Sequence, residues 1–199
     1  GLDVETRIIA PLTHDTGSAY AAVPVDMEEY ERGQYGILSS GTWSLIGVEL
    51  SEPLMTPEAR SRNYTNEGGI NGTIRFLRNV TGLWLIQQCK KTWDQAGNNM
   101  EWDEIVEKAR NAHPFRHFIY PDDPSFVNPL DMVDAIGEYL KRTGKEPATT
   151  VGEIARTIFE SLAIRYKQAI NDLEEITGTS LEVLHIIGGG SQNELLNQF

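Results

Sequence analysis

The chain has 199 residues, of which 40% are hydrophobic, and this is enough for one well-packed domain or a domain with an insertion. Its 29 acidic residues outnumber the 17 basic ones and give a net charge of -12, which argues against binding to nucleic acid or to an anionic membrane. No apolar run approaches the ~20 residues that span a bilayer, and the N-terminus lacks signal-peptide features, so we expect a cytosolic protein.

The first expected element is a strand over residues 7–12, where branched apolar residues are frequent. It leads into the segment THDTGSA at 13–19, in which Asp15 is the lone carboxylate among small side chains. A substrate can approach such a carboxylate closely. Two chemistries need this arrangement: a general base that takes a proton from an alcohol, and one half of an aspartic-protease dyad.

The next pattern is a strand, a tight turn and a second strand over residues 35–50, with Ser39, Ser40, Gly41 and Thr42 at the turn. If the strands align, this turn faces the same chemistry as Asp15. Residues 51–72 are rich in Pro, Asn, Thr and Gly and predict a long irregular connection, of a kind that is often functional.

Helical spacing of apolar residues predicts two helices, over 83–93 and 102–109. The single cysteine, Cys89, lies in the first of them and is expected to be a buried thiol. A third helix is predicted to begin with Asn128 as its cap and to run to about residue 142.

The longest predicted element is a helix of ~28 residues whose apolar face covers a sheet. Thr150 and Glu153 form a capping-box pattern at its start, and Gly178 can end it in a left-handed conformation.

His113 and His117 have the spacing of a helical metal-binding pair. Pro114 disfavours a regular helix at this point, and no nearby carboxylate completes a site. We therefore predict no metal ligand from this chain.

A buried strand is predicted over 181–187, and the glycine turn GGGSQN at 188–193 leads directly into a helical segment. In this layout, backbone N–H groups and a helix N-terminus can meet a phosphate or a nucleotide. The turn lacks the third glycine of the dinucleotide fingerprint and the lysine of a P-loop, so neither motif is supported. Strands separated by helices place the chain in the α/β class.

Two interpretations of Asp15 compete. DTGSA at 15–19 matches the aspartic-protease signature, but no second DTG occurs, long helices fill a chain that should be nearly all β, and His14 replaces an apolar residue. The kinase interpretation uses more of the chain: an aspartate base, a Gly-Thr turn and a glycine turn supply a proton acceptor, phosphate ligands and a nucleotide seat. A non-catalytic ATP-binding module is the third alternative.

Taken together, the motifs resemble the FGGY family of carbohydrate kinases, and within it the kinases of L-rhamnulose. Those that carry the resemblance occur in the expected order: THDTGSA, SSGTWSLIG, TNEGG, RNVTGLWLIQ, ARTIFESLAIRY and HIIGGGSQNELLNQ. The resemblance implies a ribonuclease H-like domain of the actin, Hsp70 and sugar-kinase superfamily, with a mixed sheet flanked by helices. It also implies that residues 1–199 are most of the C-terminal, nucleotide-side domain, that an N-terminal domain precedes them, and that the closing helices follow them.

The resemblance assigns roles residue by residue. Asp15 corresponds to the proton acceptor, and His14, Asp15, Thr16 and Asn79 to substrate-binding positions. Thr42, Gln87, Gly189 and Asn193 correspond to nucleotide-binding positions. Structural alternatives stay open for several of them: Thr42 could fix a turn, Asn79 and Gln87 could cap or cover a helix, and Gly189 could be needed only for its backbone conformation.

The implied reaction transfers a phosphoryl group from ATP, with Mg²⁺, to the 1-hydroxyl of L-rhamnulose, a step of rhamnose catabolism. Another ketose, such as L-fuculose or D-xylulose, is the alternative substrate. The implied partners are therefore a small sugar and MgATP.

Overall fold

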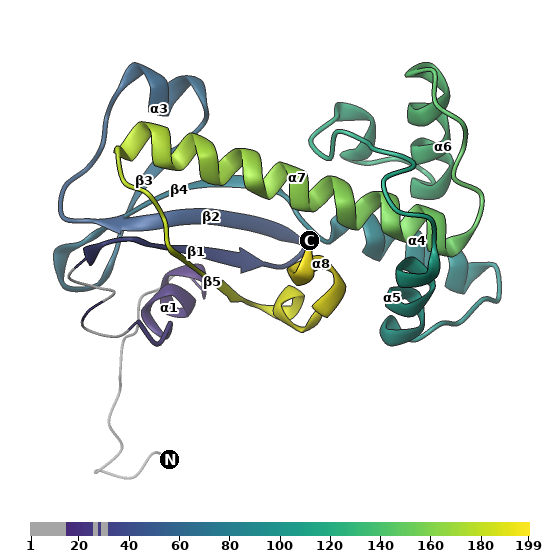
Figure 1. Ribbon diagram of the computed structural model, residues 1–199, viewed down its shortest axis with the longest axis horizontal. Helices are drawn as coiled ribbons and strands as arrows, with labels where there is room; N and C mark the ends of the chain where they lie inside the picture. Colours follow the sequence, from purple (N-terminus) through teal and green to yellow (C-terminus); the bar gives the residue numbers. More distant parts are fainter. Residues whose placement is uncertain (1–14, 26–27, 29–31) are drawn as a thin grey trace, which may run out of the picture.

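The computed structural model describes residues 15–25, 28 and 32–199. In these residues a five-stranded sheet has the strand order β3-β4-β2-β1-β5, with helices on both faces (Figure 1). The strands are β1 (Tyr35–Ser40), β2 (Trp43–Leu50), β3 (Thr65–Gly68), β4 (Ile74–Thr81) and β5 (Val183–Ile187). Because β1 pairs antiparallel with β2 and parallel with β5, the sheet is mixed, as predicted.

The predicted hairpin over 35–50 is confirmed as β1 and β2. Side chains alternate between the two faces of the sheet. Ile46 belongs to the core on the face under the long helix, whereas Ile37 and Leu77 belong to a second cluster on the opposite face. Tyr20 of helix α1 (Asp15–Ala21) closes that second cluster, and its hydroxyl donates to the carbonyl of Ile37 at 3.2 Å. The predicted strand over 7–12 lies outside the described residues.

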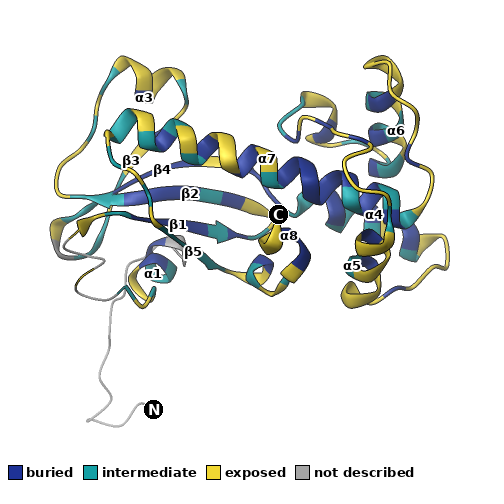
Figure 2. Ribbon diagram, viewed as in Figure 1, coloured by how far each residue is buried: buried dark blue, intermediate teal, exposed yellow. Residues whose placement is uncertain are grey.

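The long helix is α7 (Val151–Thr177), and both of its predicted ends are confirmed. The Thr150 side chain accepts from the Glu153 backbone N–H, the Glu153 side chain accepts from the Thr150 N–H, and Gly178 is left-handed with φ of 70°. Figure 2 shows that burial is most complete in the N-terminal half of α7. No helix in the described part of the chain has the length and apolar character needed to cross a membrane.

Three further helices form a layer beside the sheet: α4 (Trp84–Gln95), α5 (Trp102–Asn111) and α6 (Met132–Arg142). The first two match their predictions. Cys89 is fully buried in α4, and burial raises the pKa of its thiol, so it stays protonated. The predicted start of the third is wrong: Asp131, not Asn128, caps α6, because its carboxylate accepts from the first free backbone N–H groups of that helix.

The prediction of an irregular connection over 51–72 is wrong in part. This stretch contains the short helix α3 (Pro57–Ser61), strand β3 and the 3-10 turn η1 (Ile70–Gly72). Thr56 caps α3 through its hydroxyl, which accepts from the backbone N–H of Ala59 at 3.1 Å. The edge strand β3 forms by pairing its backbone with that of β4. The four residues of β3 carry no strand pattern of their own, so the sequence does not predict it.

Candidate active site

Three turns meet at one end of the sheet, and strand register brings them there. Ser39 pairs with Ile187, so the glycine turn after β5 lies beside the end of β1. Trp43 pairs with Thr81, so the end of β4 lies beside the start of β2. We call these turns the turn cluster: the β1–β2 turn (Gly41, Thr42), the β4–α4 turn (Gly82, Leu83) and the glycine turn (Gly188–Gly190).

The first two turns of the cluster are joined by backbone hydrogen bonds. Leu83 N–H donates to the carbonyl of Gly41 at 2.8 Å, and Trp84 N–H donates to that of Thr42 at 3.1 Å. These bonds satisfy two of the N–H groups that the start of α4 would otherwise leave unpaired. Gly82 permits the approach, since a Cβ there would clash with the Gly41 carbonyl. The position of Thr42 is thus fixed by backbone.

Two residues predicted to face the nucleotide lie in contact. The Thr42 hydroxyl donates to Oε1 of Gln87 at 3.0 Å, which joins the β1–β2 turn to α4 across 45 residues of sequence. Thr42 is exposed and Gln87 half-buried, so both can reach a ligand from the solvent side. With Oε1 used as an acceptor, the Nε2 hydrogens are the donors that Gln87 can offer.

The three glycines of the glycine turn differ in whether a side chain could be accommodated: Gly188 and Gly190 have no room for a Cβ, whereas Gly189 has. Gly188 has φ of 84°, and a Cβ on it would lie 2.6 Å from the Ser40 carbonyl oxygen. A Cβ on Gly190 would clash with the Ser40 hydroxyl. Gly189 is exposed, is not left-handed, and a Cβ there would meet nothing within 4 Å. Among the described residues, neither backbone conformation nor packing therefore requires glycine at 189, and its predicted role beside the nucleotide stays a prediction.

Asn193 has a structural task. It follows the 3-10 turn η3 (Gly189–Gln192) and caps α8 (Glu194–Gln198), because its Oδ1 accepts from the Leu196 N–H at 3.1 Å. This bond fixes the orientation of the amide next to the glycine turn.

Two buried hydroxyl groups, those of Ser44 and Tyr166, lie on the core side of the turn cluster. Ser44 Oγ lies 2.8 Å from Tyr166 Oη of α7, and both groups are buried. Burial raises the pKa of Tyr166, so the phenol stays protonated and able to donate. Ser44 also lies under Gly82, and Ser40 lies under Gly190, so these two serines touch the two turns on either side of Thr42.

The sugar-side residues are described less completely. Asn79 is exposed on β4, on the face that carries α1, because it lies two residues beyond Leu77 of the α1-side cluster. Asp15 and Thr16 form the start of α1, but the positions of their side chains fall outside what the structure describes. His14 lies outside the described residues.

The family description "FGGY family of carbohydrate kinases, C-terminal domain" matches residues 36–199, which include all three turns. The chain belongs to the FGGY family of carbohydrate kinases. Curated relatives include the rhamnulokinases of Bacteroides thetaiotaomicron, 47% identical over 192 residues, and of Bacillus subtilis, 42% identical over 192 residues. In both cases the match covers 96% of this chain and 38% of the relative, so the FGGY chain spans about two fifths of the length of these kinases.

Part of each of two solved xylulose kinases has a similar fold. The xylulose kinase from Rhodospirillum rubrum superposes with a TM-score of 0.61 at 14% identity, over 83% of this chain and 32% of that one. That from Lactobacillus acidophilus gives 0.57 at 16% identity, over the same shares. The predicted fold, a mixed sheet flanked by helices as in these sugar kinases, is confirmed. The rhamnulokinase relatives, which match 96% of this chain, favour the kinase interpretation of DTGSA over the protease interpretation.

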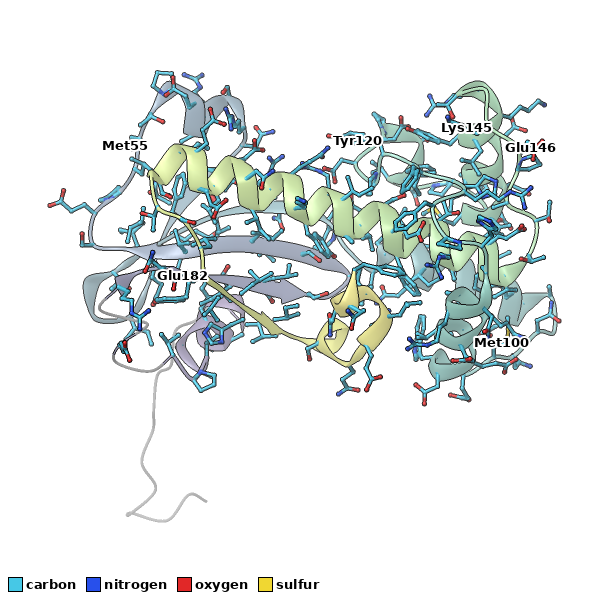
Figure 3. All side chains as sticks on the ribbon, in the orientation of Figure 1. Met55, Met100, Tyr120, Lys145, Glu146 and Glu182 are labelled. Atoms are coloured by element: carbon cyan, nitrogen blue, oxygen red, sulfur yellow. The ribbon has the colours of Figure 1, made fainter. Side chains whose placement is uncertain are left out.

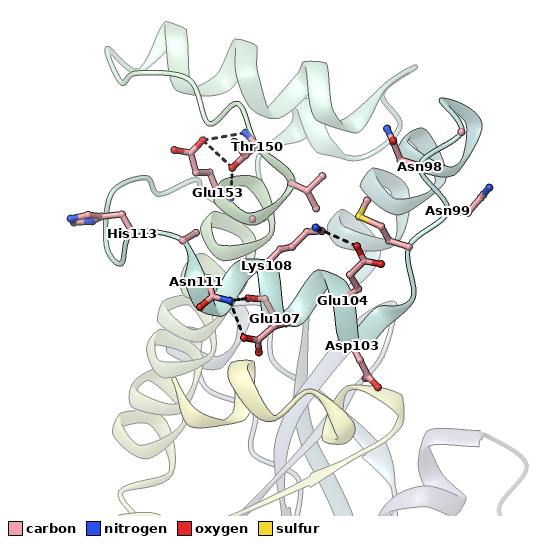
Figure 4. A pocket seen from close by; sticks show the side chains of 15 residues that line it. Asn98, Asn99, Asp103, Glu104, Glu107, Lys108, Asn111, His113, Thr150 and Glu153 are labelled. Atoms are coloured by element: carbon pink, nitrogen blue, oxygen red, sulfur yellow. Dashed lines mark hydrogen bonds and ion pairs between the residues drawn. The ribbon is translucent and has the colours of Figure 1, made fainter.

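A broad pocket in the FGGY chain lies elsewhere, between α5 and the start of α7 (Figure 4). Its lining includes Asp103, Glu104, Glu107 and Glu153 against the single cation Lys108. Met100, which also lines it, lies in the helical layer away from the sheet (Figure 3). An acidic lining repels phosphate, and none of the described side chains assigned to substrates lines this pocket.

Sequence reasoning missed the hydroxyl support of the turn cluster. The sequence patterns place Ser40 at a turn and assign no partner to its hydroxyl or to that of Ser44. A signal was present: strand alternation places Ser44 on the same face as Ile46, so a polar side chain there is buried and needs a partner.

Proposed function

We propose that this chain is the nucleotide-side part of an ATP-dependent kinase that phosphorylates the 1-hydroxyl of L-rhamnulose. The observation that carries the proposal is the meeting of Thr42, Gln87 and the open Gly189 at one end of the sheet. The substrate comes from the curated relatives, whose printed name is rhamnulokinase. Because the chain covers only part of their length, activity belongs to the whole protein, which we place in the cytoplasm.

In the proposed reaction the 1-hydroxyl oxygen attacks the γ-phosphorus of ATP in line with the bond that breaks, and ADP leaves. Asp15 accepts the hydroxyl proton, a role that contributes typically ~10²–10⁴ in rate. The larger share comes from holding the phosphates in position, for which Thr42, Gln87 and the backbone at Gly189 are the groups of this chain. His14, Thr16 and Asn79 orient the sugar beside Asp15.

Magnesium is the remaining component of the proposed reaction. The described residues contain no group of three or more acidic, histidine or cysteine side chains able to hold a metal ion. In the proposed reaction Mg²⁺ would be carried by the ATP phosphates, since this ion keeps several waters and needs few protein ligands. When bound, it neutralises phosphate charge, which the acidic chain would otherwise repel.

We further propose that an N-terminal domain supplies the other wall of the site and that the closing helices follow Phe199. Closure of two domains around the substrates excludes water and limits idle ATP hydrolysis. The 199-residue chain by itself should therefore form no ADP in response to sugar.

The test uses the full-length kinase that carries this chain. L-rhamnulose should stimulate ADP release, and Asp15→Asn should abolish that turnover while ADP affinity stays nearly unchanged. Asp103→Asn, a change on α5 away from the turn cluster, is the matched control and should retain activity. A panel with L-fuculose, D-xylulose, L-ribulose and glycerol identifies the preferred acceptor. ATP binding without turnover on any sugar would contradict the proposal and favour a non-catalytic module.

A further inference from the structure

One residue of the turn cluster's surroundings has no task in the proposal above. Trp43 follows Thr42 directly and is the first residue of β2. Its side chain is 53% exposed. Among the described residues, every other large hydrophobic side chain with comparable exposure lies in a helix, a loop or the chain end, so Trp43 is the one that projects from the sheet.

Strand geometry places Trp43 on the same face of the sheet as Asn79, a residue proposed to bind the sugar. Trp43 is two residues from Leu45, which packs with the cluster on the α1 face, so the indole leaves the sheet on that face. Trp43 is paired with Thr81 and Leu45 with Asn79, which makes Trp43 and Asn79 diagonal neighbours on one face. Diagonal positions are roughly 7–8 Å apart, within reach of an aromatic side chain.

The side chains on either side of Trp43, Thr42 and Ser44, each have a hydrogen-bond partner within the chain. Thr42 bonds to Gln87 of α4, and Ser44 turns inward to Tyr166. The half-exposed indole presents an aromatic surface next to the exposed amide of Asn79 and one residue from the predicted phosphate contact. The apolar face of the Trp43 indole beside the hydrogen-bonding amide of Asn79 suits a ligand that is apolar in one part and hydroxylated in another.

We propose that Trp43 is a specificity-determining residue that packs against the methyl group of a 6-deoxyketose while Asn79 bonds a hydroxyl of the same sugar. This inference rests on the proposed kinase function. A methyl and a hydroxymethyl group differ by one hydroxyl, and an apolar surface disfavours the hydroxyl because covering it leaves it without a hydrogen bond. Trp43 thus selects the deoxy sugar.

The experiment compares L-rhamnulose with L-fructose, which differ only at C6, in the full-length kinase. We expect the wild type to prefer L-rhamnulose in kcat/KM and Trp43→Ala to reduce that preference roughly ten-fold, the lower end of what one methyl-sized difference is worth in an apolar site. Trp43→Phe should keep part of the preference. Trp102→Ala, which removes an indole of similar exposure from α5, should leave it unchanged.

Each other result overturns the assignment in its own way. Equal loss of activity on both ketoses would mean that Trp43 contacts another part of the protein rather than C6. A raised KM for ATP with unchanged sugar preference would place it against the nucleotide. A wild-type enzyme that phosphorylates neither ketose would contradict both the proposed function and this inference. An active wild type whose sugar preference is unchanged by Trp43→Ala would contradict the inference alone.

Discussion

The hydroxyl of Thr42 and the amide of Gln87 form a 3.0 Å hydrogen bond that ties the β1–β2 turn to α4. If both hold the nucleotide, Thr42→Val and Gln87→Ala should each weaken ADP binding by about ten-fold or more without changing the KM for the ketose. Thr42→Ser should keep most of the affinity. Because the two side chains share a bond, the double variant should lose less than the sum of the single losses. Calorimetric titration with ADP measures this, Gln88→Ala is the control, and strict additivity would argue against a shared site.

Gly188 and Gly189 should respond oppositely to the same substitution. Gly188→Ala forces a side chain into a left-handed position 2.6 Å from the Ser40 carbonyl, so it should destabilise the fold by about 1–3 kcal/mol. Gly189→Ala meets open space and should leave the melting temperature unchanged while it weakens ADP binding. Thermal melts and nucleotide titrations on both variants separate the two effects. A Gly189→Ala protein with normal ADP affinity would remove this position from the nucleotide site.

Removal of the buried Tyr166 hydroxyl tests the support beneath the turn cluster. Tyr166→Phe leaves Ser44 without its 2.8 Å partner, which should cost about 1–3 kcal/mol of unfolding free energy. Urea denaturation gives that value. Tyr120→Phe serves as the comparison, since its ring is half exposed in the loop beside α7 (Figure 3). If both variants unfold at the same urea concentration, the hydroxyl pair contributes nothing to stability.

The start of α7 should make stability depend on pH. Hydrogen bonds from the backbone N–H groups of Thr149 and Thr150 lower the pKa of Glu153 from 4.5 to about 2. A carboxyl whose pKa is depressed by folding contributes stability above its unfolded pKa and loses it as the pH falls to the folded one. The melting temperature of the wild type should therefore exceed that of Glu153→Gln at pH 7, and the gap should close between about pH 4.5 and 2.

The stability difference between wild type and Glu153→Gln should be small, because the Glu153 side chain is only partly shielded and water screens its charge. We expect at most about 1 kcal/mol, the usual worth of an N-terminal cap. Glu138→Gln, at a strongly exposed position of α6, should show no such pH-dependent gap. A constant difference between wild type and Glu153→Gln from pH 7 to pH 2 would mean that the charge plays no part.

Local signals predicted α7 from end to end, since Thr150, Glu153 and Gly178 each act on backbone groups within a few residues. The edge strand β3 was missed because its pairing depends on β4, and the start of α6 was misplaced because Asp131 competes with Asn128 as a cap. The nucleotide-binding roles of Thr42 and Gln87 stay predictions, and the structure adds the hydrogen bond between their side chains. The Ser44–Tyr166 contact spans 122 residues and no local pattern specifies it.

The length of α7 has a consequence for how the molecule opens. Its C-terminal half lies on the sheet, where Tyr64 donates to the carbonyl of Ala169 and Asp172 pairs with Arg78. Its N-terminal half packs against α5 at Gly152, and Glu160 accepts from the Phe115 N–H. Helix α7 thus packs on both the sheet and the helical layer. If either of them unfolds, the apolar surface of α7 that it covers becomes exposed. Sheet and helical layer should exchange their slowest amide protons as a single cooperative unit.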